Sequence, residues 1–200
     1  MLEIETPHGL ARAHLQQVDE ARGALVLGHG AGGGVTARDI VAAAGAANAA
    51  GLSAALVEQP YRVAGRRSPA PAHQLDTAWV AVVEQLRAGP LNGLPLVAGG
   101  RSSGARVACR TAAETGAVGV VCLAFPLEPP SRGVSRPSRL PELDAVSVPV
   151  LVVQGRNDRF GMPPESPRRT VVQVAGDHSL RTDLGALAEA VESWLRSILS

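Results

Sequence analysis

Short runs of consecutive apolar residues alternate along this 200-residue chain with longer segments in which apolar residues recur every three or four positions. A short apolar run is typical of a strand buried on both faces of a sheet. The longer segments have the periodicity of helices. The alternation predicts an α/β fold, a mainly parallel sheet covered by helices on both faces. The predicted strands lie at residues 24–27, 53–57, 96–98, 117–123, 150–153 and 170–174, and the predicted helices at residues 37–50, 73–86, after 102 and from 182 onward.

Three stretches depart from this alternation. Residues 2–5 and 10–18 alternate loosely between apolar and polar positions around Pro-His-Gly, which predicts an opening antiparallel hairpin. Residues 59–71 are rich in Pro, Gly and Arg and predict a loop, and residues 126–149 are Pro-rich, with at most a short helix around 140–146. No internal repeat or linker is visible, so we expect residues 1–200 to form a single domain.

The start of the helix at residues 37–50 carries a recognisable signal. Thr36 stands at the expected cap position, and Asp39 lies three residues later, where an acidic side chain completes a capping box. We therefore expect Thr36 to cap this helix.

Composition narrows the class of protein. The chain is 46% hydrophobic with a net charge of +1 and 2% aromatic residues, which argues against a dedicated nucleic-acid-binding protein. The longest apolar run, residues 117–127, is shorter than the roughly 20 residues that span a bilayer. Cys109 and Cys122 are too few for a disulfide framework and are expected to be buried thiols, and no signal peptide is visible. These features predict a cytoplasmic protein with no membrane contact, and the spacing of Cys and His offers no metal site.

The stretch around residue 102 carries the strongest chemical signal. An apolar run ends in the pattern G-x-S-x-G at residues 100–104, followed by helical periodicity. In a strand-turn-helix nucleophile elbow the central Ser102 takes a strained conformation, so Gly100 and Gly104 must be small. The helix behind it would direct its N–H groups at negative charge on a substrate. The pattern by itself is equally compatible with an ordinary loop.

A serine nucleophile needs a base and a carboxylate that orients the base. Asp158 follows the apolar strand at 150–153, and His178 follows the one at 170–174. Taken singly, Asp158 is also explained as a turn residue and His178 as a cap of the final helix. Together they stand in the order Ser, acid, His, each at a strand end, which favours a catalytic triad. Asp177 is a poorer candidate for orienting His178, because the side chains of adjacent residues generally diverge.

The Gly-rich loop at residues 28–34 is the second expected part of such a site. The N–H groups of Ala31 and Ser103 would form an oxyanion hole, and His29 would brace the loop. The same loop also fits G-x-G-x-x-G between a strand and a helix, with Glu58 placed to bind a ribose. That dinucleotide-binding alternative leaves the elbow, Asp158 and His178 unexplained, so no cofactor is expected.

Basic residues near the expected site allow two interpretations. Tyr61, Arg62 and Arg101 could line the mouth of a pocket and favour an anionic substrate. Alternatively, residues 59–71 form a solvated loop and Arg101 pairs with a local acid.

Five motifs together resemble the α/β-hydrolase superfamily, and within it the small dienelactone hydrolase-like branch. They are Gly-Arg-Ser-Ser-Gly, His-Gly-Ala-Gly-Gly, Gln-Pro-Tyr-Arg, Gln-Gly-Arg-Asn-Asp and Gly-Asp-His-Ser. The resemblance implies an α/β-hydrolase fold, a doubly wound sheet with Ser102 as nucleophile, Asp158 as acid and His178 as base. Dienelactone hydrolases proper use a cysteine nucleophile, so their substrate is not carried over. The stretch between residues 123 and 150 is too short for a helical cap domain, which predicts an open site.

Two hypotheses of function result. The first is a serine hydrolase that cleaves a carboxylic ester, or a thioester or lactone, of a small to medium-sized molecule. The second is a non-catalytic α/β-hydrolase-like interaction module. The intact set of catalytic residue types favours the first. The particular ester, the pathway and the oligomeric state stay open.

Overall fold

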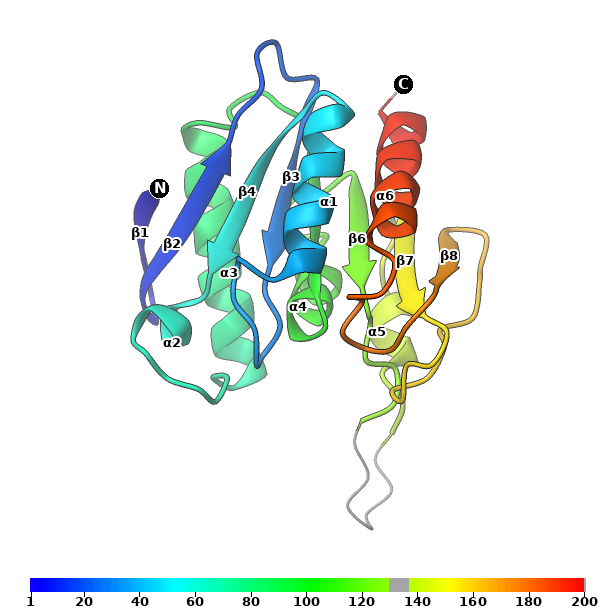
Figure 1. Ribbon diagram of the computed structural model, residues 1–200. Helices are drawn as coiled ribbons and strands as arrows, with labels where there is room; N and C mark the ends of the chain where they lie inside the picture. Colours follow the sequence, from blue (N-terminus) through cyan, green and yellow to red (C-terminus); the bar gives the residue numbers. More distant parts are fainter. Residues whose placement is uncertain (130–136, 200) are drawn as a thin grey trace.

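The apolar runs form one continuous sheet. The computed structural model describes residues 1–129 and 137–199, and in these residues eight strands pair in the order β1-β2-β4-β3-β5-β6-β7-β8 (Figure 1). The first two pairings, β1 with β2 and β2 with β4, are antiparallel, and the others are parallel. The strands are β1 (Leu2–Thr6), β2 (Gly9–Gln16), β3 (Gly23–Gly28), β4 (Leu52–Glu58), β5 (Leu96–Arg101), β6 (Gly119–Leu123), β7 (Val150–Gly155) and β8 (Arg169–Val174).

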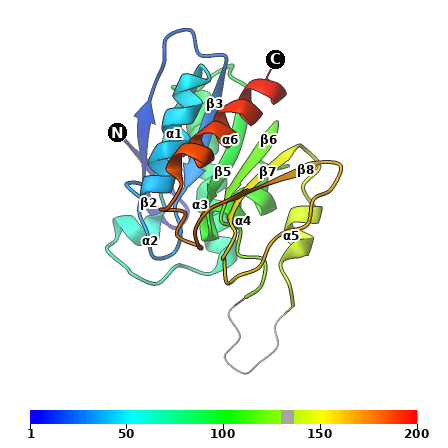
Figure 2. The same ribbon diagram turned by 45° about the vertical axis from the view of Figure 1, so that its right-hand side comes forward.

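Helices cover both faces of the sheet, as the alternating pattern predicts. On one face α1 and α6 lie side by side, and on the other α3 and α4 pack against the central strands (Figures 1 and 2). The helices are α1 (Arg38–Ala49), α2 (Pro60–Val63), α3 (Ala72–Ala88), α4 (Ser103–Thr111), α5 (Leu140–Asp144) and α6 (Leu184–Ile198).

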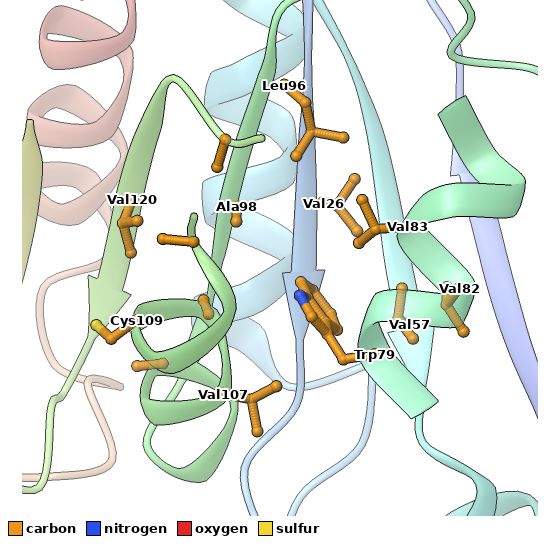
Figure 3. Close-up of a cluster of buried hydrophobic side chains, with 14 of the residues drawn as sticks. Val26, Val57, Trp79, Val82, Val83, Leu96, Ala98, Val107, Cys109 and Val120 are labelled. Atoms are coloured by element: carbon orange, nitrogen blue, oxygen red, sulfur yellow. The ribbon is translucent and has the colours of Figure 1, made fainter. Parts of the chain in front are cut away.

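Each face of the sheet has its own hydrophobic core. Beneath α3 and α4, Trp79 packs among Val26, Val57 and Val107 (Figure 3). Beneath α1 and α6, Leu25 and Leu27 of β3 contact another buried cluster that includes Ile40 and Val191. Because successive residues of a strand point to opposite faces, β3 must be apolar at nearly every position to supply both cores.

The strand order determines where a site can form. After β3 the chain crosses to β4 on one side and then to β5 on the other, so the carboxyl ends of β3 and β5 flank a change of winding direction. The arrowheads of β3, β4, β6 and β7 reach the same edge (Figure 1). Crevices at such a switch point, outside the carboxyl ends of the strands, are the usual ligand sites of open α/β sheets.

Two local predictions are wrong. Thr36 does not cap α1: the helix begins at Arg38 after Ala37, whose side chain makes no cap hydrogen bond, and Thr36 is exposed. The stretch predicted as a loop at residues 59–71 contains the helical turn α2, which begins with a proline at its first position. The final helix is capped by Asp183, which accepts the N–H of Ala186 at 3.0 Å.

The connection between β6 and β7 contains no cap domain in its described part, residues 124–129 and 137–149, where α5 is the single helix. The remainder of the predicted Pro-rich stretch, residues 130–136, lies outside the described residues. In the described chain no helix has both the length and the apolar character needed to cross a bilayer. Cys109 and Cys122 are buried free thiols, as predicted, with their sulfur atoms 3.5 Å apart.

The close backbone packing around Gly104 leads to a prediction about the stability of the protein. A Cβ on Gly104 would overlap the carbonyl oxygen of Gly28, and backbone cannot withdraw as a flexible side chain does. We expect Gly104→Ala to lower the free energy of unfolding by about 1–3 kcal/mol or more in urea denaturation. Gly45→Ala is the matched control, because Gly45 is exposed in α1 with open space around it, and it should raise stability by about 0.5–1 kcal/mol. Equal stabilities of Gly104→Ala and the unmodified protein would contradict the close packing.

Candidate active site

Ser102 occupies a sharp turn between β5 and α4. Its backbone has φ 53° and ψ −108°, a left-handed conformation that is costly for a residue with a side chain. Space for the turn depends on its two glycines: a Cβ on Gly100 would lie 2.6 Å from the carbonyl carbon of Gly104. The local structure is therefore that of a nucleophile elbow, as G-x-S-x-G predicts.

The structure brings Ser102, His178 and Asp158 into one chain of hydrogen-bonding distances. Nε2 of His178 lies 3.0 Å from Oγ of Ser102, and Nδ1 of His178 lies 2.8 Å from Oδ2 of Asp158. The Asp158 side chain is fully buried, whereas that of His178 is 18% exposed. Asp158 follows β7 and His178 follows β8, so three separate strand ends supply the three groups. We call them the Ser102 cluster.

Two residues that sequence reasoning missed hold Asp158 and His178 in place. Gln154, fully buried at the end of β7, donates from Nε2 to Oδ2 of Asp158 at 2.9 Å and also to the carbonyl oxygens of Phe125 and Gly161. The N–H of Phe160 donates to the other oxygen of Asp158 at 2.9 Å. The Phe160 ring packs edge-on against the His178 ring, with centroids 4.4 Å apart. The one sequence signal for Gln154 is that a polar residue directly follows the apolar run at residues 150–153.

The Asp177 carboxylate makes its hydrogen bonds with Ser179. Its Oδ1 accepts hydrogen bonds from both the N–H and the hydroxyl of Ser179, and these bonds lower the pKa of the fully exposed Asp177 carboxyl. These contacts agree with the expectation that Asp158, and not Asp177, is the partner of His178.

The predicted oxyanion donors are two backbone amides, that of Ser103 at the elbow and that of Ala31 in the Gly-rich loop after β3. Ser103 is the first residue of α4, and its N–H has no acceptor among the described residues; the same holds for the N–H of Ala31. The loop that carries Ala31 is pressed against α4, because a Cβ on Gly104 would contact the backbone of both Gly28 and His29. The Tyr61 hydroxyl donates to the carbonyl oxygen of Ala31 at 3.5 Å.

His29 is buried, and both its ring nitrogens are engaged. Nδ1 lies 2.9 Å from the carbonyl oxygen of Gly30, and Nε2 accepts the N–H of Gln59 at 3.1 Å. Burial lowers the pKa of the His29 imidazole, opposed by its bond to Gly30, and the Arg62 guanidinium lowers it further. A neutral ring with one donating and one accepting nitrogen fits the predicted role of a brace for the loop.

The residues proposed for substrate contact lie in different surroundings. Tyr61 is buried, and Arg62 is half-buried, with no hydrogen bond or ion pair of its side chain within residues 1–129 and 137–199. Arg101 donates from Nε to Oδ2 of Asp39 at 3.1 Å and from Nη2 to the carbonyl oxygen of His178 at 2.8 Å. Arg101 therefore pairs with an acidic residue, which lies 62 residues earlier in the chain, and the substrate contact expected of Tyr61, Arg62 and Arg101 stays a prediction. Glu58, considered for ribose binding, lies 3.0 Å from His14.

A groove of about 560 Å³ adjoins the Ser102 cluster. It runs between the Gly-rich loop, the start of α1 and the loop after His178. Its walls include Gly33, Gly34, Arg38, Arg101, Ser179 and Arg181. The described residues contain no group of three or more His, Cys, Asp or Glu side chains arranged to bind a metal ion.

A family model described as an alpha/beta hydrolase domain matches residues 21–190. The chain belongs to this family. The matched region begins before β3 and ends within α6, so it includes every residue of the Ser102 cluster and the Gly-rich loop. Among curated proteins, no match was found.

Solved structures share the fold of this α/β hydrolase over almost its whole length. Est1E from Butyrivibrio proteoclasticus, in a structure with ferulic acid bound, superposes with a TM-score of 0.80 at 17% identity, covering 98% of each chain. A serine hydrolase without a lid from Xanthomonas campestris gives a TM-score of 0.74 at 20% identity, covering 96% of this chain and 93% of that one. A dienelactone hydrolase from Anabaena variabilis gives 0.78 at 18% identity, covering 98% and 95%. The resemblance to the lid-less, dienelactone hydrolase-like branch is thus confirmed at the level of the fold.

The buried His29 predicts a pH dependence of stability. In the unfolded chain His29 takes up a proton near its ordinary pKa of about 6.5, whereas the folded protein resists protonation because the folded pKa is lowered. The unfolded state then binds more protons, so the contribution of His29 to stability falls as the pH drops below about 6.5. We expect His29→Gln, whose amide oxygen can accept the N–H of Gln59, to lose less stability than the unmodified protein between pH 7.5 and 5.5.

The measurement is urea denaturation at a series of pH values. His8→Gln is the control, because His8 is exposed and its replacement should leave the pH dependence unchanged. Identical pH slopes for His29→Gln and the unmodified protein would rule out a neutral, buried His29.

Proposed function

We propose that this α/β hydrolase is a serine hydrolase that cleaves carboxylic esters, or chemically similar thioesters and lactones. The observation that carries the proposal is the unbroken sequence of contacts from Ser102 Oγ through His178 to Asp158, at 3.0 and 2.8 Å. A serine beside a histidine that is in turn oriented by a buried carboxylate is the arrangement that activates a hydroxyl for attack on a carbonyl carbon.

In this mechanism His178 moves the protons. Ser102 Oγ attacks the ester carbonyl while Nε2 of His178 accepts the hydroxyl proton, and the same nitrogen then donates it to the departing alcohol oxygen. In the second half of the reaction His178 takes a proton from a water molecule whose oxygen attacks the acyl carbonyl, and it returns that proton to Ser102 Oγ as the bond to the acyl group breaks and the acid leaves. The Asp158 carboxylate fixes the tautomer with the proton on Nδ1 and stabilises the imidazolium that forms in each half.

The amides of Ala31 and Ser103 serve as the oxyanion donors. Both are unpaired within the described residues, and the contact of Gly104 with the Gly28–His29 backbone keeps their two segments together. The N-terminal end of α4 adds the positive end of its helix dipole at the same place. One such donor typically accounts for about 10²- to 10³-fold in rate.

The surroundings of the Ser102 cluster favour substrates of small to medium size. The described residues form no cap over the cluster, and the groove of about 560 Å³ beside it is open to solvent. Because Est1E was solved with ferulic acid bound, ferulate esters belong in a first substrate screen beside short aliphatic esters. The two buried thiols, 3.5 Å apart and unbonded, support a cytoplasmic, reducing place of action.

Labelling with a fluorophosphonate tests the proposal directly. We expect a single adduct on Ser102, located by intact mass and peptide mapping, because the probe reacts with an activated serine. His178→Ala should abolish the adduct, and Asp158→Asn should lower kcat on a reactive ester by about 10⁴-fold. Asp177→Asn is the matched control: it changes an adjacent carboxylate that does not contact the His178 ring, and its kcat should stay within about twofold.

Correctly folded protein that gives no adduct would refute the hydrolase and favour the non-catalytic interaction module. An Asp177→Asn variant as slow as Asp158→Asn would show that the wrong carboxylate was assigned.

A further inference from the structure

Arg101 joins the parts of the Ser102 cluster through a single side chain. It is the last residue of β5, so its backbone leads directly into Ser102, while its Nη2 donates to the carbonyl oxygen of His178 at 2.8 Å. Its guanidinium also lies against the Gly-rich loop, since a Cβ on Gly30 would be 2.8 Å from Nη1. Arg101 thus precedes Ser102 directly in the chain, donates a hydrogen bond to the loop that carries His178, and packs against the Gly-rich loop.

Asp39 fixes the direction of the Arg101 side chain. It is the second residue of α1, its side chain is 3% exposed, and Oδ2 accepts from Nε of Arg101 at 3.1 Å. Its other oxygen accepts the N–H of Ile40 at 3.0 Å. A buried carboxylate without a partner is strongly destabilising, so Asp39 holds the guanidinium at this position. The contacts leave Nη2 aimed at the His178 carbonyl.

The loop that carries His178 is anchored on either side of it, by the N–H of Asn157 on the carbonyl oxygen of Gly176 at 2.9 Å and by the buried Leu180. His178 stands between β8 and α6, and nearby Leu180 has a positive φ of 49°. The His178 ring is oriented by Asp158, but the ring alone does not determine how far the loop backbone lies from Ser102. Within the described residues, the one hydrogen bond that the His178 carbonyl accepts comes from Arg101.

We propose that Arg101 and Asp39 act as a positioning pair that sets the distance between His178 and Ser102 and supports the Gly-rich loop. The inference rests on the proposed hydrolase function and assigns Arg101 no contact with substrate. Because β5 carries the guanidinium on its last residue and leads directly into Ser102, a displacement of β5 moves nucleophile and base together. The pair therefore preserves the proton-transfer distance between Ser102 and His178.

Replacing Arg101 should slow catalysis without weakening substrate binding. Misplacement of a catalytic group by about 1 Å typically costs about 10²-fold in rate. We expect Arg101→Met to lower kcat on a neutral short-chain ester by about 10- to 100-fold and to change KM by less than about threefold. The rate of fluorophosphonate labelling should fall in the same proportion. Arg101→Lys, which can make one of the two bonds, should lie between Arg101→Met and the unmodified protein.

Two further variants separate positioning from general destabilisation. Asp39→Asn keeps an acceptor but removes the charge, so it should lower kcat less than Arg101→Met, and the double variant should be no slower than Arg101→Met alone because both residues act through the same contact. In Arg101→Ala, millimolar guanidinium chloride should restore part of kcat, whereas equal sodium chloride should not. Arg156→Met is the matched control, since Arg156 is exposed on the loop that also carries Asp158, and it should match the unmodified protein.

Each variant is first checked for folding by its melting temperature and circular dichroism. If Arg101→Met does not fold, Arg101→Lys and Asp39→Asn provide the comparison. Folded variants with unchanged kcat and labelling rate, while the unmodified protein is labelled at Ser102, would overturn the positioning pair alone. Unmodified protein that takes no label and cleaves no ester would overturn the proposed function and this inference with it.

Discussion

The close approach of β3, β5 and the start of α4 is the constraint on which the site depends. Gly28, Gly100 and Gly104 meet with no room for a Cβ on Gly100 or Gly104. That contact forces the turn at Ser102 into its left-handed conformation and presses the Gly-rich loop against α4. The positions of Ser102 and of both proposed oxyanion amides therefore depend on the packing of three backbone segments against one another.

Polar contacts position Asp158 and His178 relative to Ser102. Gln154 ties Asp158 to the carbonyl oxygens of Phe125 and Gly161, so the carboxylate is anchored to segments after both β6 and β7. Arg101 ties the His178 carbonyl to Asp39 on α1. Both anchors are buried or nearly so, where the low local dielectric constant makes each hydrogen bond electrostatically stronger than it is in water. The loops after β7 and β8 are thus oriented by side chains that lie beneath them on the sheet.

The sequence predicted those features whose cause lies in a few neighbouring residues. Strands buried on both faces are apolar runs, the elbow has its two glycines, and Asp158 and His178 each follow a strand by a short turn, so their meeting follows from strand order at one edge. The predicted capping box of Thr36 and Asp39 is absent because Asp39 pairs with Arg101, which lies 62 residues away in the chain. No local pattern reports such a partner.

The same limit explains why the sequence leaves two interpretations of Arg101 open, contact with a substrate and pairing with an acid. The sequence shows that a positively charged arginine precedes Ser102, but it does not show in which direction the arginine side chain points. The direction is set by the burial of Asp39, because a carboxylate 3% exposed must be paired, and the guanidinium is the cation within reach. Arg101 lies in the wall of the groove, but its charge is offset there by Asp39. The Gly-rich loop and the loop after His178 carry groups of the proposed site and also form walls of the groove, so the contacts that Arg101 makes with both loops fix the walls together with the site.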